Sequence, residues 1–173
     1  MRKFTTNRLT HMAAFIAIQI ILSRFLSINA PSLRIGFAFV PIAVCAYLYG
    51  PGWTVLVGVT ADIIGSAFLS TGWYPPITIT MALSSLTFGL LLYRRRNPGP
   101  LHTTAAAAID NLVLSLFLQT YWLTLLLGKG YMALLPGRVF QAFVVFGVQC
   151  VLLPLIIKMS ERLARYFNIG DAR

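Results

Sequence analysis

Arginine at the edge of an apolar segment is the first feature of this sequence that could do chemistry. Arg24 lies near the end of an apolar run that starts at Ala13, and Arg34 follows a short loop, just before a second apolar run. A charged arginine at the centre of a bilayer costs about 2.5 kcal/mol or more. Arg24 therefore requires a partner, a wet cavity or a ligand.

The composition indicates an integral membrane protein. Of the 173 residues, 58% are hydrophobic and 10% are charged, and the mean hydropathy is +0.79, whereas soluble domains are about a quarter charged. The net charge of +10 could indicate nucleic-acid binding, but most basic residues lie at the ends of apolar runs, where the positive-inside rule explains them. We therefore expect a multi-pass protein of a bacterial plasma membrane and no nucleic-acid partner.

The apolar runs predict an all-α fold, a single domain of residues 1–173 with six transmembrane helices. The expected helices span about residues 9–26, 35–49, 53–69, 77–93, 103–127 and 132–163. The basic residues that place both termini in the cytoplasm are Arg2, Lys3, Arg8, Arg94, Arg95, Arg96, Lys158, Arg162, Arg165 and Arg173. The N-terminal segment is expected to be retained as the first helix.

Prolines and loops complete this expected layout. Residues 27–33 are expected to form an external loop. Pro41 should stand one to two turns inside the second helix, where it would free a backbone carbonyl and mark a cavity wall. Pro136 and Pro154 predict a break or kink in the sixth helix.

The outer half of the expected bundle has an excess of positive charge. Its basic residues are Arg24, Arg34, Lys129 and Arg138, and of the four acidic residues only Asp62 could approach this level. An anionic ligand entering from outside would balance the charge. Three alternatives stay open: Lys129 in water, Arg34 at lipid headgroups, and Arg24 paired with Asp62.

Arg138 fits these alternatives least well. It stands in the first turns of the sixth helix, and Gln141 lies on the same face three residues later. The aromatic residues Phe37, Trp73 and Tyr74 are expected at the same level and could stack on a flat ring, although aromatic belts are common at membrane interfaces. These residues indicate a ligand with an aromatic ring and one or more carboxylates.

Motifs for catalysis and cofactor binding are absent from the sequence. It contains no P-loop, no HExxH and no GxSxG. Cys45 and Cys150 stand apart and form no metal-ligand pattern with the histidines. We expect no enzymatic activity, no metal and no cofactor.

The order and spacing of several motifs resemble the substrate-binding S component of energy-coupling factor (ECF) vitamin transporters, specifically the folate branch. The motifs are SRFLSI, RIGFAFVP, YGPGW followed by ADIIG, YPPITIT, GLLLYRRR and YWLTLLLGKGYMALLPGRVFQ. The resemblance implies a six-helix protein that captures folate at the outer face with high affinity. It also implies a transmembrane coupling subunit and two ATPase subunits as partners, and toppling of the S component in the membrane.

The resemblance also implies roles for particular residues. Its pocket candidates are Arg24, Arg34, Phe37, Trp73, Tyr74, Arg138 and Gln141. Ala13 and Ala17 match the small-residue motif through which S components dock on the coupling subunit. Where the family has a Phe-Pro-Gly-like entry to the fourth helix, this chain has Trp73-Tyr74-Pro75-Pro76, which leaves the ring contact there open.

Two alternatives to folate capture remain. The chain could be an S component for another vitamin, although the shortage of acidic residues in the outer half argues against a cationic vitamin such as thiamin. It could also be a structural membrane protein whose arginines only anchor it.

Overall fold

The computed structural model describes residues 6–25, 27–30, 33–69, 74–93, 100–128 and 130–166. Trp73 and Lys129 lie outside these ranges, and so do most of the expected cytoplasmic basic residues. The elements are α1 Thr6–Arg24, β1 Ile28–Ala30, β2 Leu33–Ile35, α2 Phe39–Tyr49, α3 Pro51–Leu69, α4 Pro75–Leu92, α5 Pro100–Ala108, η1 Ile109–Gln119, α6 Thr120–Leu127 and α7 Tyr131–Tyr166.

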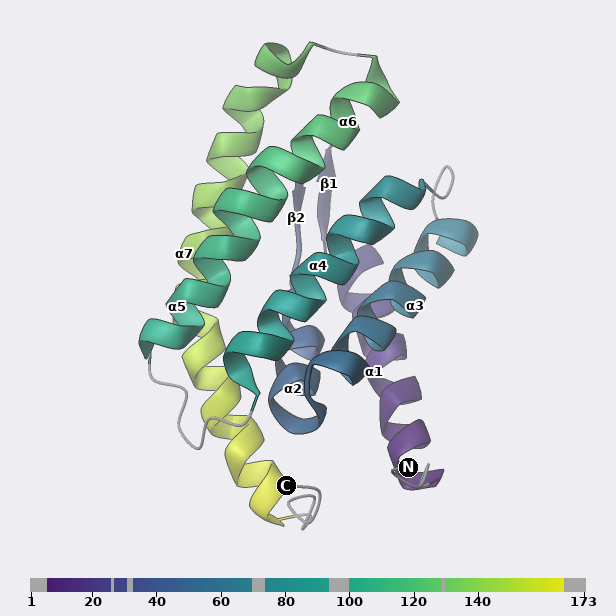
Figure 1. Cartoon of the computed structure of the whole chain (residues 1–173), viewed down its shortest axis with the longest axis vertical. Helices are drawn as coiled ribbons and strands as arrows, with labels where there is room; N and C mark the ends of the chain where they lie inside the picture. Colours follow the sequence, from purple (N-terminus) through teal and green to yellow (C-terminus); the bar gives the residue numbers. More distant parts are fainter. Residues whose placement is uncertain are drawn as a thin grey trace.

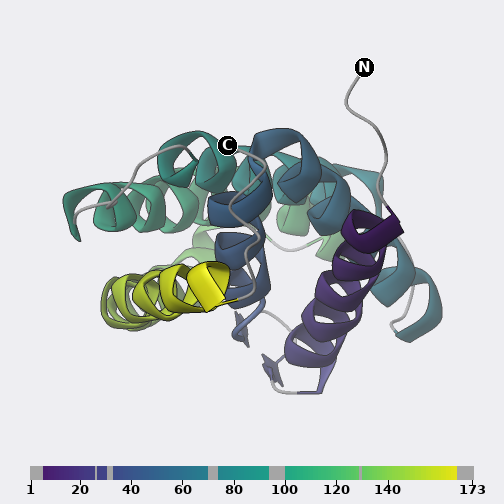
Figure 2. The same ribbon diagram turned by 90° about the horizontal axis from the view of Figure 1, so that it is seen from below.

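The described elements form a bundle of six helical rods, because α5, the π-helix η1 and α6 follow one another without interruption. The short helix α2 stands between α1 and α7 (Figure 2) and also packs on α3 and α4. The first turn of α1 and the last turn of α7 lie at the same end of the molecule (Figure 1). The all-helical six-helix fold is thus confirmed, with one small β-hairpin added.

The hydrophobic core forms around α2. Its buried residues come from α2, α4, α5 and α7 and are Phe39, Ile42, Ala43, Ala46, Tyr47, Phe88, Leu92, Ala106, Ala107, Leu153 and Ile157. The turn from α2 to α3 passes through Gly50, whose φ of 87° is accessible to glycine at little cost. This short, buried α2 leaves space above it, on the side of the β-hairpin.

Two local expectations are wrong. Residues expected as an external loop and a helix start form the antiparallel hairpin β1–β2, with Asn29 opposite Arg34. Because the pairing holds residues 33–35 in extended conformation, α2 begins at Phe39. Pro41 therefore lies in the first helical turn, where its missing N–H removes no helical bond, and it does not free a carbonyl deep in a helix.

The sixth rod is one continuous helix. The chain is helical throughout Tyr131–Tyr166, with Pro136 and Pro154 inside, so of the two predicted outcomes the break does not occur, and the kink stays a prediction. Each proline removes one backbone hydrogen bond, and the many other hydrogen bonds of this long helix keep it helical at both positions.

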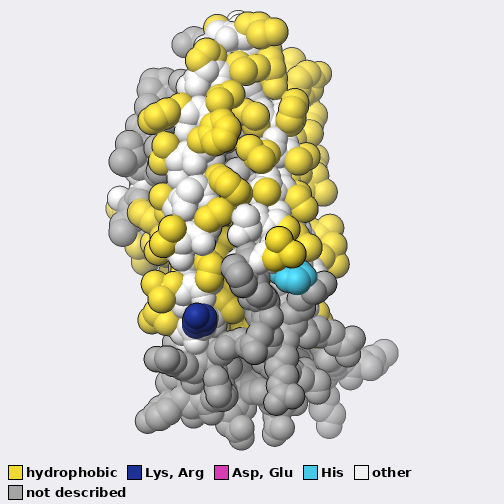
Figure 3. All heavy atoms as spheres, turned by 90° about the vertical axis from the view of Figure 1, so that its left-hand side faces the viewer, with side chains coloured by type: hydrophobic (Ala, Val, Ile, Leu, Met, Phe, Trp, Pro, Cys, Tyr) yellow, Lys and Arg dark blue, Asp and Glu magenta, His cyan; other side chains and the backbone are white. Residues whose placement is uncertain are grey.

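The outer surface of the bundle is apolar. Figure 3 shows hydrophobic side chains over most of the described part of the face formed by α7 and its neighbours, where the Lys or Arg colouring appears only toward the lower end. Exposed large residues on this rod include Phe140, Phe143, Val151 and Leu155. Three helical stretches, Pro75–Leu92, Leu101–Leu126 and Tyr131–Ser160, are long and apolar enough to cross a membrane. Apolar side chains facing outward along such helices fit a lipid environment.

Close packing of α3 on α4 yields the first prediction. A Cβ added to Gly89 would overlap the Cα atom of Pro51, which belongs to the backbone of α3 and cannot move aside as a side chain could. We expect Gly89→Ala to destabilise the protein by about 1–3 kcal/mol because the helices must separate. Thermal unfolding in detergent measures the change.

The matched control is Gly147→Ala on α7, where no atom lies within 4 Å of the added Cβ. It should be neutral or stabilising by up to about 1 kcal/mol. Equal melting temperatures for Gly89→Ala and the parent protein would contradict the packing described here.

Candidate functional site

A cavity lies inside the bundle, between the hairpin and α2. Its volume is about 170 Å³, roughly ten times the space that one water molecule requires. The residues that line it are Gln19, Ser23, Ser27, Gly36, Ala38, Phe39, Ile42, Ala61, Asp62, Ile77, Thr80, Met81, Ser84, Phe88, Asp110, Asn111, Leu114, Ser115, Gln119, Gln141, Val145 and Gln149. Such a space, with apolar walls and convergent polar groups, is typical of a small-molecule site.

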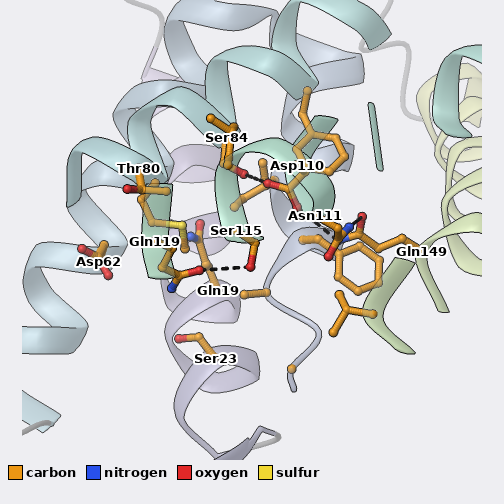
Figure 4. A pocket seen from close by; sticks show the side chains of 18 of the residues that line it. Gln19, Ser23, Asp62, Thr80, Ser84, Asp110, Asn111, Ser115, Gln119 and Gln149 are labelled. Carbon is orange, nitrogen blue, oxygen red and sulfur yellow. Dashed lines mark hydrogen bonds between the residues drawn. The ribbon is translucent and has the colours of Figure 1, made fainter. Parts of the chain in front are cut away.

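One end of the cavity, its floor, is polar, and Asp110 is the centre of its hydrogen bonds. Ser84 on α4 donates a hydrogen bond to Oδ1 of Asp110, and the Gln149 amide on α7 donates to Oδ2 at 3.3 Å. Asn111 donates to the Gln149 side-chain oxygen at 2.8 Å and to the Ala107 carbonyl at 2.8 Å. Figure 4 shows these side chains converging from three helical rods. The network fixes the carboxylate in place at the floor of the cavity.

The π-helix η1 is the element that makes this lining possible. In an α-helix of 3.6 residues per turn, Asp110 and Gln119 would point to roughly opposite faces. The wider π-helix has about 4.4 residues per turn, which returns both side chains to nearly the same direction. Both residues line the cavity, as do Asn111 and Ser115 between them. One strongly polar face of η1 therefore points inward, and apolar Val113 and Phe117 are exposed.

Two further polar groups face the cavity from the opposite wall. Asp62 on α3 accepts a hydrogen bond from Thr78 at 2.8 Å. Gln19 on α1 is only 1% exposed, and its side-chain oxygen has no hydrogen-bond partner. Among the described residues, the lining contains no Lys or Arg. The described wall is thus rich in acceptors and poor in positive charge.

Arg138 and Gln141 lie toward the N-terminal end of α7. Arg138 is 5% exposed and donates to the Gln141 side-chain oxygen at 3.3 Å, whereas its Nε has no hydrogen-bond partner. Gln141 lines the cavity directly. The predicted pairing of these two residues on one helix face is therefore seen, and it joins a buried cation to the cavity wall.

The other predicted pocket residues are not among the described residues that line the cavity. Phe37 is 37% exposed and packs against Phe39 at a ring distance of 6.4 Å, between the lining residues Gly36 and Ala38. Tyr74 is half-buried at the start of α4. Arg24 ends α1 and Arg34 lies in β2, but their side chains are outside the described part of the structure, as is the whole of Trp73. Whether these residues contact a ligand stays a prediction.

Sequence reasoning missed the floor of the cavity. It placed only Asp62 within reach of the outer half and did not include Asp110 among the pocket residues, whereas Asp110 lines the cavity. The argument against a cationic ligand loses force for the same reason. Polar residues at intervals of four to five, from Asp110 through Ser115 to Gln119, were the available signal for a widened helix.

The face of α1 away from the cavity carries the two predicted docking residues. Ala13 and Ala17 are exposed, and the large exposed apolar residues of the same region are Leu9, Ile18, Ile21 and Phe25.

In the described part of the chain, no three His, Cys, Asp or Glu side chains are grouped as metal ligands.

Comparison with known proteins identifies the family. Residues 7–157 match the family described as ECF transporter, substrate-specific component. The chain is similar to the folate transporter FolT of Clostridium novyi (strain NT), with 29% identity over 158 residues and 91% of each chain covered. It is 25% identical to the folate transporter FolT of Leuconostoc mesenteroides subsp. mesenteroides over 153 residues, 85% of this chain and 82% of the relative.

Solved structures share the fold. The crystal structure of FolT bound with folic acid matches with a TM-score of 0.82 at 22% identity, covering 86% of this chain and 91% of that chain. An S component for biotin from an ECF-type ABC transporter matches with a TM-score of 0.62 at 15% identity, covering 94% and 95%. With a family match over most of its length and this shared fold, the chain belongs to the substrate-specific components of ECF transporters, a family of membrane transport proteins rather than enzymes.

Proposed function

We propose that this chain is the folate-binding subunit of an ECF transporter and that the cavity above α2 is its binding site. Two relatives named as folate transporters align over at least four fifths of the chain, which favours folate over other vitamins. The cavity supplies a defined space inside the bundle for the ligand.

The observation that carries the proposal is the polarity of the site along α7. Gln149, at the floor, and Arg138, at the outer end, are about 16 Å apart along the helix axis at 1.5 Å per residue. The floor presents acceptors, and beside the lining residue Gln141 lies the buried guanidinium of Arg138, whose Nε has no hydrogen-bond partner. Folate is elongated and has a flat, donor-bearing ring at one end and carboxylates at the other, so its two ends complement the two ends of the site.

The direction of capture follows from the same polarity. With the first turn of α1 and the last turn of α7 at one end of the bundle, and basic residues concentrated beside those segments in the sequence, that end faces the cytoplasm. The hairpin, Arg34 and Arg138 then lie on the outer side. Folate enters from outside, and Arg24 and Arg34 stand in sequence positions from which they could meet its carboxylates.

A cationic vitamin is the second candidate. Asp62 and Asp110 both line the cavity, and a positively charged ring such as that of thiamin would gain from two carboxylates. The buried Arg138 beside Gln141 opposes a cation at the outer end, and for this reason we place folate first.

Transport requires partners, and α1 offers the surface for them. We propose that a transmembrane coupling subunit docks on the exposed face around Ala13 and Ala17, and that two ATPase subunits supply the energy. Small residues allow the backbones of two helices to approach closely within lipid.

The first test is isothermal titration of the purified chain with folate, without ATP. We expect tight binding by the parent protein and a loss of about 2 kcal/mol or more in Arg138→Ala, because a carboxylate would lose its buried partner. Lys158→Ala, which removes an exposed cation from the same helix, is the matched control and should bind like the parent.

Unchanged affinity in Arg138→Ala would remove this arginine from the site. Binding of thiamin or riboflavin in place of folate would move the chain to another branch of the family. A folded parent protein that binds no vitamin would favour a structural role.

The second test separates docking from capture. Ala13→Leu and Ala17→Leu should leave folate binding unchanged but reduce uptake in cells that hold the coupling and ATPase subunits, because leucine prevents close helix contact. The control is Gly147→Leu, a similar enlargement on the exposed face of α7, across the bundle from α1. Normal uptake by both α1 variants would contradict the docking role.

A further inference from the structure

The carboxylate of Asp110 has unused capacity to accept hydrogen bonds. Each of its oxygens accepts one bond, from Ser84 and from Gln149 respectively, whereas an ionised carboxylate offers about four acceptor positions. The donors come from α4 and α7, and both donor residues line the cavity beside the carboxylate. The remaining acceptor positions of Asp110 can accept hydrogen bonds from a ligand bound at the floor.

A second, independent group points to the same kind of ligand. The Gln19 side chain enters the cavity lining from α1, is 1% exposed, and has a carbonyl oxygen with no donor. A buried acceptor left without a protein donor is unfavourable, so a ligand group that donates to this oxygen would bind favourably here. Among the described lining residues no Lys or Arg supplies such a donor.

The floor at Asp110 and the wall that carries Gln19 therefore favour a ligand end that is rich in N–H groups and carries no negative charge. An ionised carboxylate has acceptors only and would be repelled by Asp110 at close range in an apolar bundle. A 2-amino-4-oxopyrimidine ring instead carries two adjacent donors, the ring N3–H and the 2-amino group, on one edge. This edge can bind both oxygens of a carboxylate at once, which is the strongest arrangement for such pairs.

We propose that Asp110 is the specificity residue for the aminopyrimidinone edge of the ligand and that it fixes the ligand with its ring at the floor and its glutamyl tail toward Arg138. This inference rests on the proposed folate function and deepens it. Ser84 and Gln149 act as positioning residues, because they orient the carboxylate without a required contact to the ring.

The test uses fragments of folate in competition with radiolabelled folate on the purified chain. The ring fragments are pterin and pteridin-4-one, which lacks the 2-amino group, and the tail fragment is p-aminobenzoylglutamate. In the parent protein we expect pterin to compete at least tenfold better than pteridin-4-one. In Asp110→Asn we expect folate and pterin to weaken at least tenfold while the tail fragment competes as before.

The matched control is Thr124→Val. Thr124 belongs to the same rod, bonds only within its own helix to the Tyr121 carbonyl at 2.6 Å, and does not line the cavity. All ligands should bind this variant like the parent, and thermal unfolding reports whether each variant is folded.

Several results would overturn the inference. Parent-like binding of pterin by folded Asp110→Asn would do so, as would a loss confined to the tail fragment. If that variant does not fold, the two ring fragments decide the matter on the parent protein, where equal competition contradicts the proposal. A parent protein that binds no folate rejects the proposed function and this inference together, whereas folate binding without the ring effects rejects the inference alone.

Discussion

A carboxylate inside an apolar bundle is the constraint on which the rest of this structure depends. Asp110 lies where water is scarce, so its charge is tolerable only if donors surround it. Ser84 and Gln149 supply them from two other rods, and Asn111 orients Gln149 in turn. These bonds tie α4, η1 and α7 together at the floor of the cavity. The π-helix adds to this polar lining, because its wider turn presents both Asp110 and Gln119 toward the cavity.

The helical architecture could be predicted from the sequence because it follows from apolar length, which is a local property. The rods lie where the apolar runs lie, with ends shifted by a few residues. Features that depend on pairing between segments could not be predicted in this way. The start of α2 at Phe39 is one example, because it depends on the pairing of β1 with β2.

The same holds for the site. The relation of Arg138 to Gln141 is local and was predicted, whereas the meeting of Asp110 with Ser84 and Gln149 requires tertiary structure. The missed residue with the largest consequence was Asp110, because a 3.6-residue period conceals its alignment with Gln119.

In the proposed binding mode, the two ends of the site use different forces. The buried guanidinium of Arg138 would attract carboxylates over distance and contribute to capture. At the floor, short directional hydrogen bonds would select for the shape and donor pattern of a ring. The lipid-facing surface of α7 and η1 contributes to neither, and Ala13 and Ala17 lie on α1, away from the cavity lining. The proposed binding and docking sites thus lie on separate parts of one small bundle, as expected for a subunit that captures a vitamin alone and transports it only with partners.

The most direct test of this account is an experimental structure of the chain with folic acid bound. The account predicts the aminopyrimidinone edge within hydrogen-bond distance of both Asp110 oxygens, and the glutamyl carboxylates near the outer end of α7 beside Arg138. A ligand bound in the reverse direction, or one seated outside the cavity above α2, would contradict it.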